Sequence, residues 1–467
     1  MTTHAVVIGA SMAGLLAARV LRDHFDHVTI IERDKLPDGP EFRAGVPQAR
    51  HAHALLSQGQ QIMEALFPQL KDDFVAMGAP SMRWGMETAT MTPGGWVKRF
   101  DTGITTNVCT RVGLEWAIRR RLSAYDNVIF LQERQITQLL TTADHSQVTG
   151  VRVADRHGDQ IQELSADLVI DTSGRGSKTP EWLVELGYAA PKQSVVNAHL
   201  GYATRWYNMP PNVDVDWKVL LVNARPKQGL KRAGAIFQVE GDRWLAILAG
   251  TNYDYPPTDE TEFMEFAKTL ASSKVYEALQ HAEPISPVYG YRRTENVRHH
   301  YEHLTRFPER LVVMGDAFCA FNPIYGQGMT VAALDAQTLD TLLKERQGNL
   351  TGLPQAAHQR LAQTVENAWL MATGEDLRYP ETEGPRPGWM DRVVQRYLDL
   401  VMRALPRDEA AALAFMHAMN LTKAPAELLH PRILWRVLLD SLVGKPDDHL
   451  NAPTLRVREV PLAQAGD

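Results

Sequence analysis

The first 33 residues constrain the fold more than any other part of the chain. Residues 5–8 are a short apolar run (AVVI), a glycine-rich turn follows at 9–14, and apolar residues then recur with helical spacing to residue 21. Residues 28–31 form a second buried run, typical of a parallel strand. Strand, helix and strand in this order predict a βαβ unit, which binds a dinucleotide at its first turn.

The turn differs at one position from the usual G-x-G-x-x-G pattern, because Ser11 stands where the middle glycine is expected. Gly9 would allow the tight turn and Gly14 the close packing of the helix. Serine is short, and its hydroxyl could donate to a phosphate held at the helix N-terminus. Glu32 ends the second strand, where an acid accepts hydrogen bonds from ribose hydroxyls. We therefore predict a dinucleotide site in spite of Ser11.

A second segment, "VVMGDAFCAFNPIYGQGM", also combines a strand, a loop and a helix. Asp316 follows the strand, so its carboxylate could bind sugar-like hydroxyls; capping a helix is the alternative. Pro323, Gly326 and Gly328 predict a loop that a ligand can approach closely, at another helix N-terminus. Two ligand-facing loops indicate an extended cofactor.

Composition and charge exclude several classes of protein. The 467 residues are 44% hydrophobic and 22% charged, as in globular proteins, and the net charge of -6 argues against a nucleic-acid partner. Cys109 and Cys319 have no metal-ligand spacing, so we predict neither a metal site nor disulfides, and a cytoplasmic location. No run predicts an integral membrane segment, which leaves peripheral membrane contact through the amphipathic C-terminal stretches open.

Residues 195–290 alternate between apolar and polar side chains, with a hairpin tip expected at 240–242. This pattern predicts an antiparallel sheet inserted into the nucleotide-binding scaffold. Its aromatic residues could line a pocket for a bulky apolar substrate, although alternation turns about half of them away. These candidates are Tyr202, Trp206, Phe237, Trp244 and Tyr291.

The segment "QARHAHALLSQGQQIMEALF" is expected to become helical at about Ala52. His51 and His53, just before or at this point, are the candidates for a general base, if the reaction uses one. Hydrogen-bonded structural histidines are the alternative and the better supported one.

Three segments together carry a resemblance to a known family. They are the glycine-rich start with Glu32, "DLVIDTSGRGS", and "VVMGDAFCAFNPIYGQGM", and they resemble flavoprotein monooxygenases of the para-hydroxybenzoate hydroxylase fold. Through "RAGVPQARHAHALL" and "NPIYGQGM" the chain is most similar to the flavin-dependent epoxidases of polyether-ionophore biosynthesis.

The resemblance implies an α/β fold: a Rossmann-like FAD-binding domain, an inserted antiparallel-sheet substrate domain and a helical C-terminal region. The FAD-binding domain would comprise residues 1–80, 108–190 and 293–345. Residues 191–292 would form the substrate domain, with strands contributed by 81–107, and 346–467 the helical region.

The resemblance also implies roles for individual residues toward FAD. Glu32 would bind the adenosine ribose, Arg33 would flank the adenine, and Arg111 would lie near the pyrophosphate and ribityl chain. The pyrophosphate would be held by Gly9, Ser11, Met12, Ala13 and Gly14, and the ribityl or pyrophosphate region by Gly315 and Asp316. The loop against the isoalloxazine would comprise Pro323, Gly326, Gln327, Gly328 and Met329, and the covering loop Arg43, Gln48 and Arg50.

The reaction expected from this resemblance is an oxygenation in secondary metabolism. Reduced flavin and O2 give a C4a-hydroperoxide, which could epoxidise or hydroxylate a polyketide, terpenoid or aromatic substrate without a catalytic side chain. NAD(P)H or a partner flavin reductase would supply the electrons. Ser173 and Gly174 replace an Asp-Gly pair common in the hydroxylases, which puts direct reduction by NAD(P)H in doubt. An FAD-dependent reductase or dehydrogenase of a prenyl-type chain is the alternative function.

Overall fold

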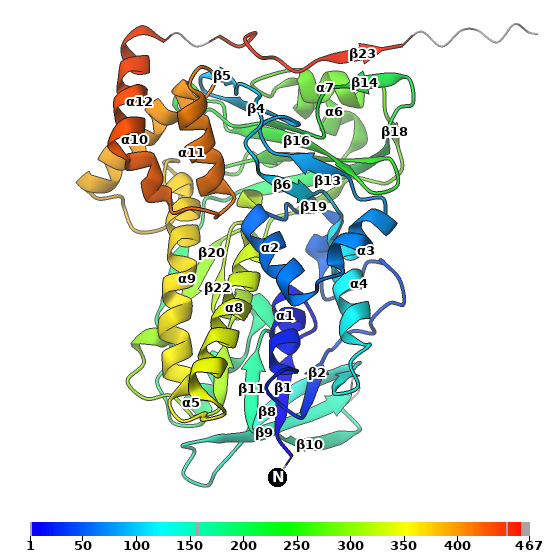
Figure 1. The fold of residues 1–467 in the computed structure, drawn as a ribbon, viewed down its shortest axis with the longest axis vertical. Helices are drawn as coiled ribbons and strands as arrows, with labels where there is room; N and C mark the ends of the chain where they lie inside the picture. The colour runs from blue at the N-terminus through cyan, green and yellow to red at the C-terminus, as the bar shows by residue number, and fades with distance from the viewer. Residues whose placement is uncertain (1, 156–157, 445–446, 459–467) are drawn as a thin grey trace, which may run out of the picture.

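The computed structural model describes residues 2–155, 158–444 and 447–458. It contains two main sheets, with helices packed between and around them (Figure 1). In the part of the chain that the structure describes, no helix combines the length and hydropathy needed to cross a bilayer.

A parallel sheet is formed by strands from distant parts of the chain, in the order β21-β11-β1-β2-β7. Their bounds are β1 His4–Ile8, β2 His27–Ile31, β7 Val128–Leu131, β11 Leu168–Asp171 and β21 Leu311–Val313. β1, β11 and the edge strand β21 are short apolar runs that are almost entirely buried, as is typical of parallel strands. The predicted βαβ start is confirmed, with α1 at Met12–Leu21. The turns that follow β1, β11 and β21 meet at one edge of this sheet.

The helices around the parallel sheet share its main hydrophobic core. They are α2 Ser57–Leu66, α3 Leu70–Ala76, α4 Arg111–Leu122, α5 Thr179–Glu185, α8 Gly328–Arg346 and α9 Leu353–Asp376. Figure 1 shows α8 and α9 side by side along one edge of the molecule, where they pack against each other. The helix expected from about Ala52 begins only at Ser57. Residues 51–56 are not helical: His51 and Leu56 have extended backbone angles, and the His51 ring hydrogen-bonds across to Thr204 of the other sheet.

The second sheet, called the mixed sheet here, pairs strands in the order β18-β13-β17-β16-β15-β4-β5, with β19 beside β13. Its strands are β4 Thr88–Thr92, β5 Gly95–Trp96, β13 Gly201–Asn208, β15 Val219–Val222, β16 Arg232–Val239, β17 Arg243–Gly250, β18 Glu283–Pro284 and β19 Tyr289–Tyr291. The hairpin tip at 240–242 is confirmed. One face of the sheet packs on α6 (Glu260–Lys268) and α7 (Lys274–Leu279) around the buried Trp244.

Smaller sheets complete the fold. They comprise β3 Ser81–Arg83 with β6 Thr105–Asn107, β8 Arg134–Thr141 with β9 Val148–Asp155 and β10 Ile161–Ser165, β12 Gln193–Val196 with β20 Asn296–His299 and β22 Cys319–Ala320, and β14 Val213–Val215 with β23 Leu455–Val457. The C-terminal region is helical, as expected, with α10 Trp389–Ala404, α11 Glu409–Met419 and α12 Pro431–Val443.

Candidate functional site

The glycine turn has the geometry that its sequence predicts. Gly9 has φ +99°, which glycine adopts without strain, and a Cβ on Gly14 would overlap the Gly9 carbonyl oxygen. Ser11 is the N-cap of α1, and its hydroxyl makes no capping hydrogen bond to the described helix. The first backbone N–H groups of α1 thus have no side-chain cap among the described residues, and such groups can bind an anion.

Arg111, the first residue of α4, is directed at this turn. Its Nη2 donates to Ser11 Oγ at 3.0 Å and pairs with Glu115 at 2.7 Å. Its Nη1 is buried without a hydrogen-bond partner among the described residues. Buried N–H groups are rarely left unpaired, so this one fits a bound phosphate. The structure therefore brings together Ser11 and Arg111, two of the predicted cofactor-binding residues.

An acidic cluster lies behind the turn. Glu32 accepts from the backbone N–H of Ala10 at 2.9 Å and from that of Asp34 at 3.0 Å. Arg43 pairs with Glu32 at 3.2 Å, with Asp34 at 2.9 Å and with Glu115 at 2.9 Å. Glu32 and Arg43 thus hold the turn and the loop after β2 together. Arg33, in contrast, is exposed.

Gly315 and Asp316, which follow β21, lie beside the glycine turn. Gly315 lies so close to the turn that a Cβ there would stand 2.6 Å from that of Ala13. The Asp316 side chain is exposed, yet desolvation by the surrounding protein raises its pKa, while the nearby charges of Arg175 and Arg111 lower it. An accessible carboxylate beside two cations can accept hydrogen bonds from a polar chain such as ribityl.

The loop before α8 is held by a carboxylate from α9. Asp376 is 1% exposed and accepts from Asn296 Nδ2 at 2.7 Å and the Tyr325 hydroxyl at 2.7 Å. Asn322 Nδ2 also donates to it, at 3.1 Å. Burial raises the pKa of Asp376 to about 6, although these three donors lower it. The loop is therefore fixed from a helix that the sequence analysis did not connect with it.

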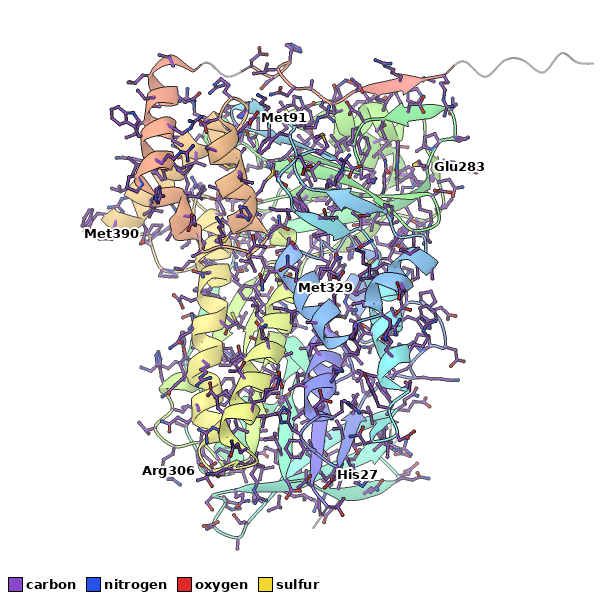
Figure 2. All side chains as sticks on the ribbon, in the orientation of Figure 1. His27, Met91, Glu283, Arg306, Met329 and Met390 are labelled. Carbon is purple, nitrogen blue, oxygen red and sulfur yellow. The ribbon has the colours of Figure 1, made fainter. Side chains whose placement is uncertain are left out.

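Helix α8 begins at Gly328 without a side-chain cap from the described residues. Gly326 has φ +67° and ends the preceding turn Pro323–Tyr325, while Gln327 is buried. Met329, in the first turn of α8, lies near the middle of the molecule (Figure 2). This second uncapped helix N-terminus could face a ligand that carries negative charge.

The segment Pro47–Arg50, which contains Gln48, leads directly into His51 and His53. His51 Nδ1 lies 2.8 Å from Thr204 Oγ1, and His53 Nδ1 lies 2.9 Å from the His51 carbonyl oxygen. Burial lowers the pKa of His51 to about 3 and that of His53 to about 4. Both rings are therefore neutral at pH 7 and would be weak bases, which favours the structural alternative.

Four of the five aromatic candidates lie on the face of the mixed sheet that is turned away from α6 and α7. Tyr202 and Tyr291 stack at 5.3 Å beside His51, while Trp206 and Phe237 share a smaller core on this face. Trp244 does not belong with them. It is 0% exposed and packs on Trp217 in the core under α6 and α7, because alternation along β17 turns it to the opposite face.

A pocket of about 420 Å³ lies between this face and the start of α4. Its aromatic and apolar walls include Phe42, Met77, Trp206, Ile285 and Tyr289, and its polar lining includes Thr110, Glu240 and Arg243. Arg50 lies 4.9 Å from the Phe42 ring centre and 4.8 Å from that of Tyr289. The pocket adjoins the candidate site, since Thr110 precedes Arg111 and Trp206 donates to the Arg50 carbonyl.

Arg175 is a further residue that the sequence analysis missed. Its guanidinium donates to the carbonyls of Glu295 at 2.7 Å and Phe321 at 2.6 Å, so it joins the end of β11 to the loop before α8. Its position directly after Ser173 and Gly174 was the available signal. Ser173 is engaged too, since its N–H and hydroxyl both donate to Asp171.

Another cluster could hold a metal ion, which the sequence analysis did not foresee. Ligand atoms of His300, Glu302 and His303 lie within 4.8 Å of one another. Glu302 already pairs with Arg298 at 3.2 Å and accepts from His300 at 3.0 Å. The cluster lies outside the candidate site described above.

Comparison with known proteins defines the family. A family model described as "FAD binding domain" matches residues 2–364, and the chain belongs to this family. The chain is 34% identical to Protein Rv3254 of Mycobacterium tuberculosis over 90% of this chain and 89% of that protein. It is 22% identical to the FAD-dependent monooxygenase atmM of Aspergillus flavus, over 87% of this chain and 84% of that protein.

Among solved structures, the fold is similar to that of a flavoprotein/dehydrogenase from Cytophaga hutchinsonii. The TM-score is 0.68 at 15% identity, over 94% of this chain and 99% of that one. The α/β fold with an FAD-binding domain and a helical C-terminal region is thereby confirmed. Three features of the site fit FAD. Arg111 Nη1 has no hydrogen-bond partner among the described residues, Gly14 lies against the Gly9 carbonyl, and α1 and α8 begin without a side-chain cap.

Proposed function

We propose that this protein is an FAD-dependent monooxygenase that epoxidises or hydroxylates a bulky apolar substrate. The observation that carries the proposal is the juxtaposition of the glycine turn, Arg111 and the start of α8 with the aromatic face of the mixed sheet. Bound FAD, once reduced, would supply the activation of O2. The protein would bind, orient and keep water from the reacting groups.

The residues divide into two groups in this proposal. The N-terminus of α1 and Arg111 would hold the pyrophosphate, Asp316 would bind the ribityl chain, and the N-terminus of α8 would face the flavin ring. Glu32 and Arg43 would keep the turn in place. Tyr202, Trp206, Phe237 and Tyr291 would contact the substrate, which would enter through the adjoining pocket.

The histidines favour epoxidation of an alkene over hydroxylation of a phenol. A phenol is activated by a base, whereas an electron-rich alkene needs no deprotonation. His51 and His53 have pKa values of about 3 and 4, so they would accept a proton poorly at pH 7. The similarity to a relative named as an FAD-dependent monooxygenase supports oxygenation in general.

Isotope labelling tests the proposal. The purified protein with FAD would be supplied with 18O2, NADPH or NADH, and a flavin reductase, together with a panel of apolar alkenes and phenols. We expect an epoxide, formed from one of the alkenes, that carries one 18O atom. A saturated product formed without O2 consumption would instead identify a reductase and would contradict the proposal. Omission of the reductase shows whether NAD(P)H reduces the flavin directly.

A further inference from the structure

Large apolar side chains are exposed on two neighbouring helices of the C-terminal region. On α10, Trp389 is 69% exposed, Met390 60% and Val393 53%. On α12, which packs against α10, Leu442 and Val443 are both 82% exposed. Helices of globular proteins normally bury such side chains, and clustered exposure marks a binding surface. We call the exposed apolar side chains of α10 and α12 the apolar helix surface.

The apolar helix surface lies apart from the candidate site. Met390 is at the outer edge of the molecule, whereas Met329 at the start of α8 is near its middle (Figure 2). The inward sides of α10 and α12 are already satisfied, because Val401, Ala404 and Val437 are fully buried in a small core of their own. The exposed residues are therefore not needed for the packing of these helices.

The charged side chains of α10 and α12 that lack an ion-pair partner among the described residues are mainly arginines. Arg392, Arg396 and Arg432 are exposed, and none has an acidic partner within the described part of the chain. The acids of these helices are engaged: Asp399 pairs with Arg378 at 2.7 Å and Asp440 with Arg407 at 2.8 Å. The third acid, Asp391, accepts from the Gly388 N–H at the start of α10. Among the exposed residues of these helices that the structure describes, the charges without an ion-pair partner are thus three arginines against one aspartate, which is a net positive charge.

We propose that the apolar helix surface docks this protein on an anionic lipid surface. Tryptophan and aliphatic side chains flanked by unpaired arginines are the combination that inserts at a lipid interface and attracts acidic headgroups. Trp435, 63% exposed on α12, adds a second indole to the surface. Docking goes beyond the proposed function and does not require it.

A second copy of the chain fits this surface less well. A two-fold interface places the same patch on both sides, so Arg392, Arg396 and Arg432 would be brought near their own copies. The core of a stable interface is also depleted of unpaired charge. Acidic lipid headgroups, in contrast, neutralise these arginines.

Vesicle co-sedimentation tests the proposal. The full-length flavin-loaded protein would be mixed with vesicles of phosphatidylcholine, or of phosphatidylcholine and phosphatidylglycerol in equal parts. We expect binding to the mixed vesicles that weakens at high salt, and weaker binding to phosphatidylcholine alone. Trp435→Glu and Leu442→Glu should each lower the affinity about tenfold or more, since each replaces an exposed apolar side chain that would insert into the lipid surface. Arg392→Gln should lower binding to the mixed vesicles only, about fivefold.

Val184→Glu is the matched control, because Val184 is also an exposed apolar residue (57%) but lies on α5. It should bind like the wild type, and flavin absorbance should show that all variants are folded. The absence of binding to the mixed vesicles by the wild type would overturn the proposal. An equal loss of vesicle binding in Val184→Glu would overturn it as well. A dimer in gel filtration that Leu442→Glu dissociates would also overturn it and would assign the surface to a second copy of the chain.

Discussion

Arg111 is the residue whose surroundings say most about the ligand. Its partners Ser11 and Glu115 satisfy part of the guanidinium, and the buried Nη1 is left for an acceptor that the described residues do not provide. Its place near the glycine turn was predictable only through the resemblance, since no local pattern links it to Ser11. The contact joins residues 100 positions apart.

Arg111→Met should weaken FAD binding by about 2–3 kcal/mol, which is a 30- to 150-fold rise in Kd, because a buried charge-assisted hydrogen bond to phosphate is lost. Fluorescence titration of the apoprotein with FAD measures this. Arg120→Met on the same helix serves as the control, since Arg120 is half exposed and points to Asp73. Equal Kd values for both variants would remove Arg111 from the site.

Asp335 predicts a pH dependence of stability. It is 1% exposed on α8, accepts from the Gly315 N–H at 3.1 Å, and burial raises its pKa from 3.8 to about 7. The folded chain thus binds this proton more tightly than the unfolded chain. The protonated Asp335 side chain therefore stabilises the fold fully below about pH 4, and this stabilisation is lost as the pH rises through about 7.

Asp335→Asn should therefore match the wild type at pH 4 and be more stable at pH 8 by about 4 kcal/mol. Urea unfolding at the two pH values measures the difference. Asp340→Asn on the same helix is the control with opposite sign, because His24 and Lys344 lower the pKa of Asp340 and its carboxylate stabilises the fold above that pKa. No gain at pH 8 in Asp335→Asn would show that this carboxyl is not desolvated in the folded chain.

Helices and strands were predictable where the local sequence determines their bounds. They were not predictable where a contact with a distant residue determines them. The strand-helix-strand start follows from apolar spacing and two glycines, and the structure reproduces it. The start of α2 was predicted five residues early, because His51, whose ring hydrogen-bonds to Thr204 153 positions away, has extended backbone angles. The loop before α8 was predicted, but its anchor Asp376 was not, because nothing in the local sequence of α9 indicates Tyr325 as a partner, 51 positions away.

Asp376→Ala should loosen the loop before α8, since three donors would lose their buried acceptor. We expect a loss of about 2–3 kcal/mol in unfolding free energy at pH 5. Faster hydrogen exchange should be confined to the loop at 322–326. Asp376→Asn, which keeps one acceptor oxygen, should lose less than half as much. Unchanged exchange in the loop of Asp376→Ala would show that the loop is held by other contacts.

The candidate site is assembled from segments that are far apart in the sequence, because each of these segments contributes a strand to the parallel sheet. The strands β1, β11 and β21 end at one edge, so the glycine turn, Arg175 and Asp316 converge although they are far apart in sequence. This convergence follows from parallel topology and could be predicted. Which face of the mixed sheet each aromatic residue takes depends on strand register, so the sequence pattern did not separate Trp244, which lies in the core under α6 and α7, from the other four candidates.

The flavin content of the purified protein tests the central claim most directly, namely that FAD is held at the turn between β1 and α1. The wild type should carry a single FAD per chain, measured by flavin absorbance after release. Ser11→Gly should keep it, because the backbone N–H groups remain, whereas Gly14→Val should lose nearly all of it, since its side chain would overlap the Gly9 carbonyl. Circular dichroism would show that Gly14→Val remains folded. Full flavin content in folded Gly14→Val would contradict this placement of the cofactor.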